Sequence, residues 1–143
     1  MSPLVSLPEY ETFVYGLQQQ FSVIQRTTLV VVRRGEAIVV VNGTIEFPQG
    51  FRLIVREQLN FAQTPGLIKG YGYEVWQNNR QLYWYDSQPH PNNPALASTD
   101  PHHKHIPPDI KHNRIPAPNM SFTQPNLPTL IEEITKLLTS KES

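Results

Sequence analysis

The segment FRLIVREQLNF, residues 51–61, decides the fold class of this chain. Apolar and polar side chains alternate along it, with Phe51, Leu53, Val55, Leu59 and Phe61 set against Arg52, Arg56, Gln58 and Asn60. Successive side chains of a strand point to opposite faces of a sheet, so this alternation is typical of a strand with one buried face. An antiparallel sheet that is covered on one side accommodates such a strand.

Similar segments lie on both sides of it, separated by short turns. Runs of β-branched and aromatic residues predict further strands over residues 27–32, 37–46, 68–76 and 81–86. Turn residues separate the strands at 34–36, 48–50, 64–66 and 78–79. Asn42-Gly43 offers a competing hairpin position, which leaves the register there open. Short turns join antiparallel neighbours, so we expect an α+β fold with an antiparallel sheet of about five strands in a meander.

A helix is expected at each end of the sheet region. Ser6 and Glu9 have the spacing of a capping box, and apolar residues follow at helical intervals, which predicts a helix over 8–20. Asn126 and Pro128 favour a second helix start, and this helix is predicted over 126–139. Its apolar stripe consists of Leu127, Leu130, Ile131, Ile134, Leu137 and Leu138. Such a stripe is expected to pack on the sheet.

Length and composition predict one domain over residues 1–143, made of a helix and sheet (1–86), a Pro/His-rich segment (87–125) and the last helix (126–139). Twelve basic residues balance twelve acidic ones, so no overall field attracts nucleic acid. The chain has no cysteine and no apolar run long enough to span a bilayer, which predicts no membrane association. The first nine residues lack the features of a secretory signal, and we therefore expect the cytoplasm.

The Pro/His-rich segment is the strongest functional signal. Ten of the 14 prolines fall between Pro89 and Pro128, nine of them in this segment, which also holds all five histidines: His90, His102, His103, His105 and His112. A solvated loop is the simpler interpretation, but prolines reduce the entropy lost when side chains must be held in place, which favours function. On a surface loop, replacing His103 or His105 by Ala is expected to change stability by no more than about 0.5 kcal/mol.

Histidine can act as general base or general acid near neutral pH, and nearby cations can stabilise a negative transition state. The residues expected to be catalytic are His103, His105, Lys104, Asp86 and Tyr85. Those expected to bind substrate are Lys111, Arg114, His112 and His102. In an extended segment the two histidines of the triplet point one way and Lys104 the other, which would make Lys111 or Arg114 the charge stabiliser. Asp86 is expected to end its strand beside this segment and to orient one imidazole.

A metal site is the alternative use of these histidines. His103-x-His105 could bind a divalent ion with a further ligand from His90, His112, Asp86 or Asp100. Neither an H-E-x-x-H nor a C-x-x-C frame is present, so we expect no metal and no cofactor.

Three stretches resemble a known family: Tyr83-Trp84-Tyr85-Asp86-Ser87, then His103-Lys104-His105, then Phe122 with the closing helix. Over about residues 70–138 the chain is similar to the TumE-like toxins of bacterial toxin-antitoxin systems. The chain departs from the family pattern at Ser87, where the family has Asn, at Pro101-His102 before the triplet, and in a longer connection over 90–100. The region 6–61 is also longer than the family's usual start.

The resemblance implies a toxin that is neutralised by an antitoxin encoded beside it, with RNA as the target. We therefore expect the toxin of a type II system that acts as an endoribonuclease by histidine acid-base catalysis, with acid and base unassigned. Two alternatives stay open: a non-catalytic module that binds a protein or nucleic acid, and a metal-dependent phosphodiesterase. Self-association is also left open.

Overall fold

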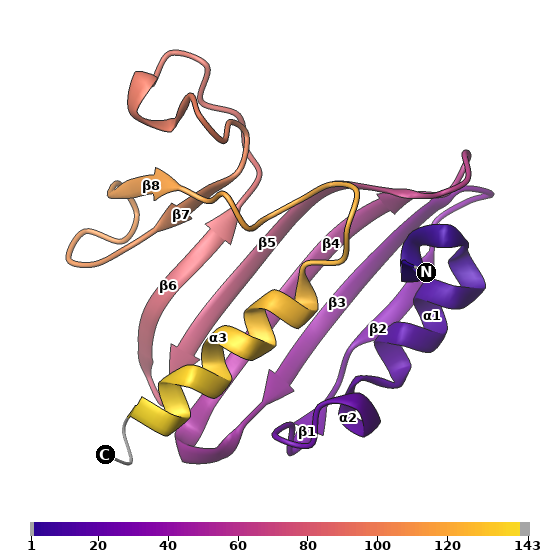
Figure 1. The fold of residues 1–143 in the computed structure, drawn as a ribbon, viewed down its shortest axis with the longest axis horizontal. Coiled ribbons are helices and arrows are strands. Elements are labelled where there is room, and N and C mark those ends of the chain that lie inside the picture. The colour runs from indigo at the N-terminus through magenta and orange to yellow at the C-terminus, as the bar shows by residue number, and fades with distance from the viewer. Residues whose placement is uncertain (1, 141–143) are drawn as a thin grey trace.

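The structure, a computed structural model, describes residues 2–140 and contains one antiparallel sheet (Figure 1). Its strands are β1 (Arg26–Thr27), β2 (Val30–Arg33), β3 (Ile38–Glu46), β4 (Phe51–Asn60), β5 (Leu67–Gln77), β6 (Arg80–Asp86), β7 (His103–His105) and β8 (Arg114–Pro116). They lie in the order β1-β3-β4-β5-β6-β7-β8, and β2 also pairs with β3. The long strands β3 to β6 form the expected meander.

The expected strand count was too low, because the described residues form eight strands instead of about five. The five predicted segments correspond to β2 through β6, and β1, β7 and β8 are additional. The turn at 34–36 does join β2 to β3, with Arg33 opposite Val39. Asn42-Gly43 does not turn the chain but lies inside β3, opposite Arg56 and Val55 of β4. Burial of Val39, Val41 and Ile45 on one face of β3 outweighs the local turn preference of this pair.

The segment 87–125 is not the long loop that was expected. It contains the short strands β7 and β8 and a 3-10 turn, η3 (Pro94–Leu96), and it extends the sheet beyond β6. In Figure 1 much of this segment projects past the end of β6. Strands of three residues carry too little periodicity to be recognised from sequence.

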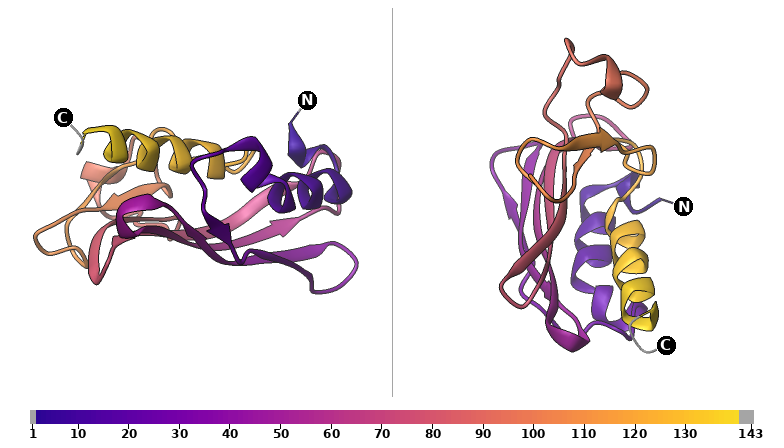
Figure 2. Two further views of the ribbon diagram at one scale, coloured as in Figure 1. Left: turned by 90° about the horizontal axis from the view of Figure 1, so that it is seen from below. Right: turned by 90° about the vertical axis from the view of Figure 1, so that its left-hand side faces the viewer.

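Helices cover one face of the sheet (Figure 2). The first predicted helix is broken at Gly16 into α1 (Leu7–Tyr15) and α2 (Leu17–Gln20), and Ser6 caps α1 by accepting from the Glu9 amide, as the capping box predicted. The last helix, α3 (Leu127–Ser140), buries Leu130, Ile134 and other members of its apolar stripe, which confirms the expected amphipathic helix. Two further 3-10 turns are η1 (Pro3–Val5) and η2 (Pro48–Gly50).

Polar contacts also fasten the helices to this face, which we call the covered face. Tyr10 of α1 and Tyr73 of β5 both donate to the carboxylate of Glu57, which is fully buried. Tyr83 and Tyr85 of β6 donate to Glu133 of α3 at 3.0 and 2.8 Å. Tyr83 and Tyr85 therefore face the helices, and Trp84 and Asp86, which alternate with them, face the opposite side.

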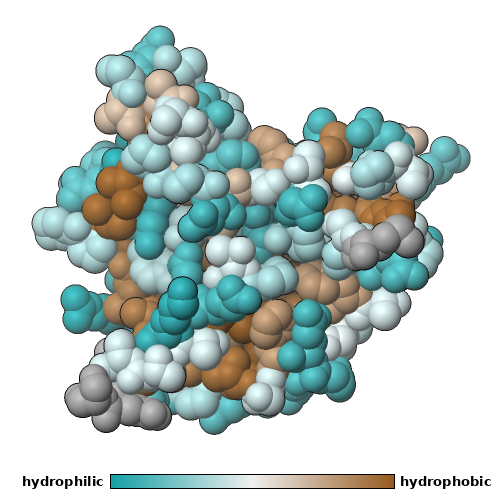
Figure 3. All heavy atoms as spheres, in the orientation of Figure 1, coloured by the Kyte–Doolittle hydropathy of each residue, from teal (hydrophilic) through white to brown (hydrophobic). Residues whose placement is uncertain are grey.

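We call that opposite side, which carries no helix in Figure 2, the open face. Figure 3 views the molecule from the covered side and shows that the projecting part of the segment 87–125 is mainly hydrophilic, whereas hydrophobic surface collects around the helices. No helix within residues 2–140 combines the length and the apolar character needed to cross a bilayer.

Candidate functional site on the open face

Strand β7 brings two histidines beside the end of β6. Asp86 is the last residue of β6 and lies opposite His103, while Trp84 lies opposite His105. Because Tyr83 and Tyr85 face α3, Asp86 and Trp84 must face away from it, and the alternation carries the two histidines to the same side. Residues far apart in the sequence thus meet on the open face.

Each imidazole is held by a backbone carbonyl. Nδ1 of His103 lies 3.0 Å from the Pro101 carbonyl oxygen, and Nδ1 of His105 lies 2.9 Å from that of Ile110. A carbonyl oxygen can only accept, so Nδ1 must be the protonated nitrogen in both rings. The neutral imidazoles therefore carry their lone pairs on Nε2.

These two Nε2 atoms are buried, and neither has a hydrogen-bond partner among residues 2–140. Both lie 4.0 Å from Oδ2 of Asp86. His103 and His105 as whole residues are 1% and 2% exposed, and buried polar atoms are normally hydrogen-bonded. Two free lone pairs and one carboxylate oxygen therefore face a common point.

Asp86 does end its strand beside the histidines, as expected, but the prediction that it orients one imidazole is wrong. Its 4.0 Å separations from both rings are too long for hydrogen bonds, and the carbonyls of Pro101 and Ile110 fix the rings instead. Its other oxygen accepts from the amide of Gln88, just beyond the strand.

Burial lowers the pKa of both His103 and His105 from the ordinary value of 6.5. The carbonyl hydrogen bonds and the negative charge of Asp86 act in the opposite direction, and the positive charge of Arg114 adds to the lowering. Both imidazoles are therefore mainly neutral at pH 7, with Nε2 able to accept a proton or a metal ion.

Aromatic rings form the walls of the site. Trp84 stacks on His105, with ring centroids 3.8 Å apart and an interplanar angle of 14°. The ring of His90 meets His103 edge-on at 4.7 Å, and the backbone of His90 is fixed by the carboxylate of Asp100 at 2.9 Å. Sequence reasoning considered His90 only as an alternative metal ligand and gave Trp84 no role at the site, although Trp84 stands two residues before Asp86 and so shares its face.

Cationic side chains surround the three groups. Arg56 and Asp86 line two adjoining hollows on the open face, and Lys111 and Trp84 line one of these. Gly72, directly opposite Asp86, makes room for Arg56, because a Cβ there would lie 2.4 Å from its Nη2. In the sequence Arg56 is one of the polar residues of the strand at 51–61, and its register opposite Gly72 is what places it at this site.

Arg114 lies on β8 opposite His105, on the far side of β7. Its Nε is buried and has no hydrogen-bond partner among the described residues. The structure therefore brings together Asp86, His103, His105, Lys111 and Arg114 of the residues predicted for the site.

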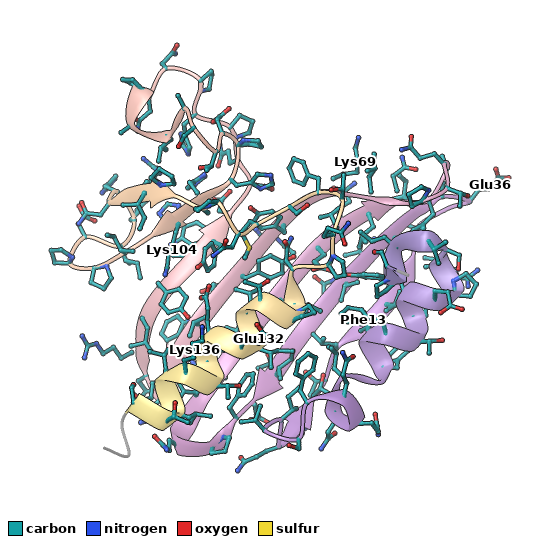
Figure 4. The ribbon with its side chains drawn as sticks, viewed as in Figure 1. Phe13, Glu36, Lys69, Lys104, Glu132 and Lys136 are labelled. Carbon is teal, nitrogen blue, oxygen red and sulfur yellow. The ribbon has the colours of Figure 1, made fainter. Side chains whose placement is uncertain are left out.

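The other predicted residues lie apart from this cluster. Lys104 points to the covered face, with Nζ 4.1 Å from the ring centre of Tyr83, and Figure 4 shows it from that side. The hydroxyl of Tyr85 is also on the covered face, bonded to Glu133. His102 stacks on Tyr71 and lies 2.7 Å from its hydroxyl. His112 is exposed and pairs with Asp109 at 3.0 Å.

Comparison with known proteins identifies the family of this chain. A model of the family described as Toxin TumE matches residues 15–138. The chain belongs to this toxin family. No curated protein and no solved structure matches it.

The family match revises one expectation about the N-terminal half. The resemblance was placed over about residues 70–138, but the TumE match begins at residue 15 and includes β1 to β4. Two other positions of the resemblance have structural roles. Ser87 accepts from the Tyr71 amide at 2.9 Å, and Phe122 packs against Tyr71 and His102. They secure the ends of β5 and β6, next to the site.

Proposed function

We propose that this TumE-family toxin is an endoribonuclease of a type II toxin-antitoxin pair, and that Asp86, His103 and His105 form its reaction centre. The observation that carries the proposal is the pair of buried, unpartnered Nε2 atoms that face one carboxylate oxygen. Leaving buried polar atoms unpaired costs free energy, about 1–3 kcal/mol for each group. Such an arrangement is typical of a site that a ligand or substrate completes.

The surroundings favour a phosphodiester substrate. Arg56, Lys111 and Arg114 supply three positive charges against the two carboxylates of Glu74 and Asp86, and this excess attracts an anionic backbone even though the whole chain is neutral. Trp84 offers an aromatic surface next to the same hollow. Single-stranded RNA, whose bases are free to stack, suits a groove of this composition.

RNA also brings its own nucleophile, the ribose 2′-hydroxyl. In the histidine mechanism, Nε2 of one imidazole takes the proton of this hydroxyl, and the cations stabilise the charge on the phosphorus centre. The leaving 5′-oxygen needs a proton or an equivalent positive charge. Because both imidazoles are mainly neutral, they supply two bases and little acid, so a further group must fill that role.

Membership of a toxin family implies an antitoxin partner. We propose that the product of the neighbouring gene binds this toxin and blocks its activity. Expression of the toxin alone should then arrest bacterial growth, and expression of the neighbouring gene with it should restore growth.

The experiment compares the wild type with His103→Ala and His105→Ala. Lys104→Ala is the matched control, because it changes the same strand on the opposite face; His90 is unsuitable because its ring contacts His103. With folding checked by circular dichroism, we expect each histidine variant to cleave a mixed RNA pool about 100- to 10,000-fold more slowly and to lose toxicity. The Lys104 variant should stay active.

Two outcomes would oppose this function. If both histidine variants cleaved RNA as fast as the wild type, the reaction centre would lie elsewhere. If purified wild-type protein cleaved no RNA, with or without divalent ions, the chain would instead be a binding module.

A further inference from the structure

Three potential ligand atoms converge on the open face: Oδ2 of Asp86 and Nε2 of His103 and His105. All lie within 4.8 Å of one another, and the carboxylate oxygen is 4.0 Å from each nitrogen. Bonds of about 2.0–2.2 Å to a shared ion place its ligand atoms roughly 3 to 4 Å apart. The two carboxylate-to-nitrogen distances thus already lie at the upper end of that range.

The supporting contacts are those of metal-binding histidines. A ligating imidazole commonly donates its other N–H to a backbone carbonyl or a carboxylate, which fixes the tautomer and aims the lone pair. His103 and His105 each make this contact, to Pro101 and Ile110. Two rings in the same tautomer, both aimed at one carboxylate, are not required to stabilise a sheet.

Burial provides an independent observation. Both rings are almost fully buried, yet their Nε2 atoms are unpartnered within the described part of the chain. In contrast, the exposed pair of His112 and Asp109 is already joined through the histidine's Nδ1. The free Nε2 lone pairs of His103 and His105 both lie near Asp86, whereas the pair of His112 and Asp109 forms no such shared site.

We propose that Asp86, His103 and His105 bind one divalent transition-metal ion of the zinc, manganese or iron class, through one carboxylate oxygen and two imidazole nitrogens. Imidazole favours these ions over magnesium and calcium, which prefer all-oxygen sites. Three protein ligands leave coordination positions for water and for a substrate oxygen. The sequence shows no metal-binding frame because the carboxylate comes from a separate strand.

The charges at the site fit an ion that also holds an anion. Asp86 contributes the single negative charge of the three ligands, and Arg114 opposes a bound cation. A phosphate oxygen on the open side would complete both the coordination and the charge balance. For the proposed nuclease, such an ion would supply the positive charge that the leaving oxygen requires. This catalytic use rests on the proposed function, whereas ion binding does not.

The test uses the full chain without a histidine tag, freed of metal by EDTA and then dialysed. Calorimetric titration with Zn²⁺ or Mn²⁺ alone should give about one ion per chain, and Mg²⁺ should bind far more weakly. Bound Co²⁺ should show the visible absorption of a nitrogen- and oxygen-coordinated ion. Asp86→Asn and His103→Ala should lose binding and the absorption, whereas the control His112→Ala should retain both.

Thermal unfolding gives a second measurement on the same proteins. Zn²⁺ or Mn²⁺ should raise the melting temperature of the wild type and of His112→Ala but not of Asp86→Asn. The proposal is overturned if the wild type binds no ion, or if binding survives in both Asp86→Asn and His103→Ala. RNA cleavage in EDTA by metal-free protein would overturn the catalytic use of the ion and leave the nuclease. Ion binding without any RNA cleavage would support the metal site and overturn the nuclease.

Discussion

Two carboxylates in the same sheet, Glu57 on the covered face and Asp86 on the open face, have opposite surroundings. Both oxygens of Glu57 accept hydrogen bonds, from Tyr10 and Tyr73. Oδ2 of Asp86 instead faces two buried nitrogens without bonding to either. The Glu57 cluster, whose carboxylate oxygens are both hydrogen-bonded, can hold α1 against the sheet but has no unpaired acceptor left for a ligand. The Asp86 cluster keeps the histidine lone pairs available for one.

The largest expected effect comes from substituting the two carboxylates in turn. Asp86→Asn should lower RNA cleavage by about 100-fold or more, because it removes a charged group of the reaction centre, with little change in unfolding free energy. Glu57→Gln should do the opposite: it should lose about 1–3 kcal/mol of stability, because one hydroxyl loses its acceptor, and keep the activity of each folded molecule. Denaturant unfolding and a cleavage assay on both variants test whether Asp86→Asn loses activity while Glu57→Gln loses stability. Equal effects on activity would remove the distinction between the two faces.

The covered face should also depend on the apolar stripe of α3. Leu130 and Ile134 are fully buried, so changing either to Ala should cost on the order of 2 to 5 kcal/mol. The matched control is Glu132→Ala, an exposed position on the same helix that is labelled in Figure 4. Urea unfolding measures the difference. Unchanged stability in both core variants would show that the helix is not packed on the sheet in solution.

The long strands could be predicted from the sequence because their alternation persists over many residues. The segment 51–61 has a buried residue at nearly every second position, and the structure makes it β4. The same signal placed β3, β5 and β6 approximately. It also predicted that Lys104 would point away from the two histidines beside it, as its contact with Tyr83 confirms.

The site itself was beyond this reasoning in two respects. A three-residue strand has no recognisable period, so His103 and His105 were assigned to a surface loop, whereas β7 buries both. The expectation that their loss would cost no more than about 0.5 kcal/mol therefore rested on a wrong premise. Pairing between β6 and β7 is also a long-range contact, so the sequence did not reveal that both histidines would share Asp86.

A smaller effect on the open face is expected from Arg114, and it depends on the proposed metal site. Arg114→Gln removes a positive charge near the three ligands, so it should tighten Zn²⁺ binding by on the order of tenfold. The same change should weaken RNA binding and reduce its salt dependence, because a phosphate contact is lost. Calorimetry with Zn²⁺ and RNA titrations at two salt concentrations measure the two opposite shifts. Weaker binding of both ligands would indicate that Arg114 supports the structure of the site.

The smallest effect concerns Glu57 and pH. Burial raises the pKa of Glu57 above its ordinary value of 4.5, and hydrogen bonds from Tyr10 and Tyr73 offset only part of this rise. The folded protein therefore holds the Glu57 proton up to a higher pH than the unfolded chain does. In that window the folded state binds more protons, so the stability contributed by this group is greatest at low pH and falls as pH rises through the folded pKa.

Glu57→Gln cannot titrate at this position, which makes it the reference. From about pH 8 down to about pH 5, the unfolding free energy of the wild type should rise relative to that of the variant. His102, His103 and His105, whose pKa values burial lowers, act in the opposite direction as pH falls, but they are present in both proteins and cancel in the difference. Urea unfolding of the pair across this range measures the trend. A difference that stayed flat, or fell with falling pH, would mean that the two tyrosine hydroxyls keep Glu57 ionised, and the covered face would then hold a permanent buried charge.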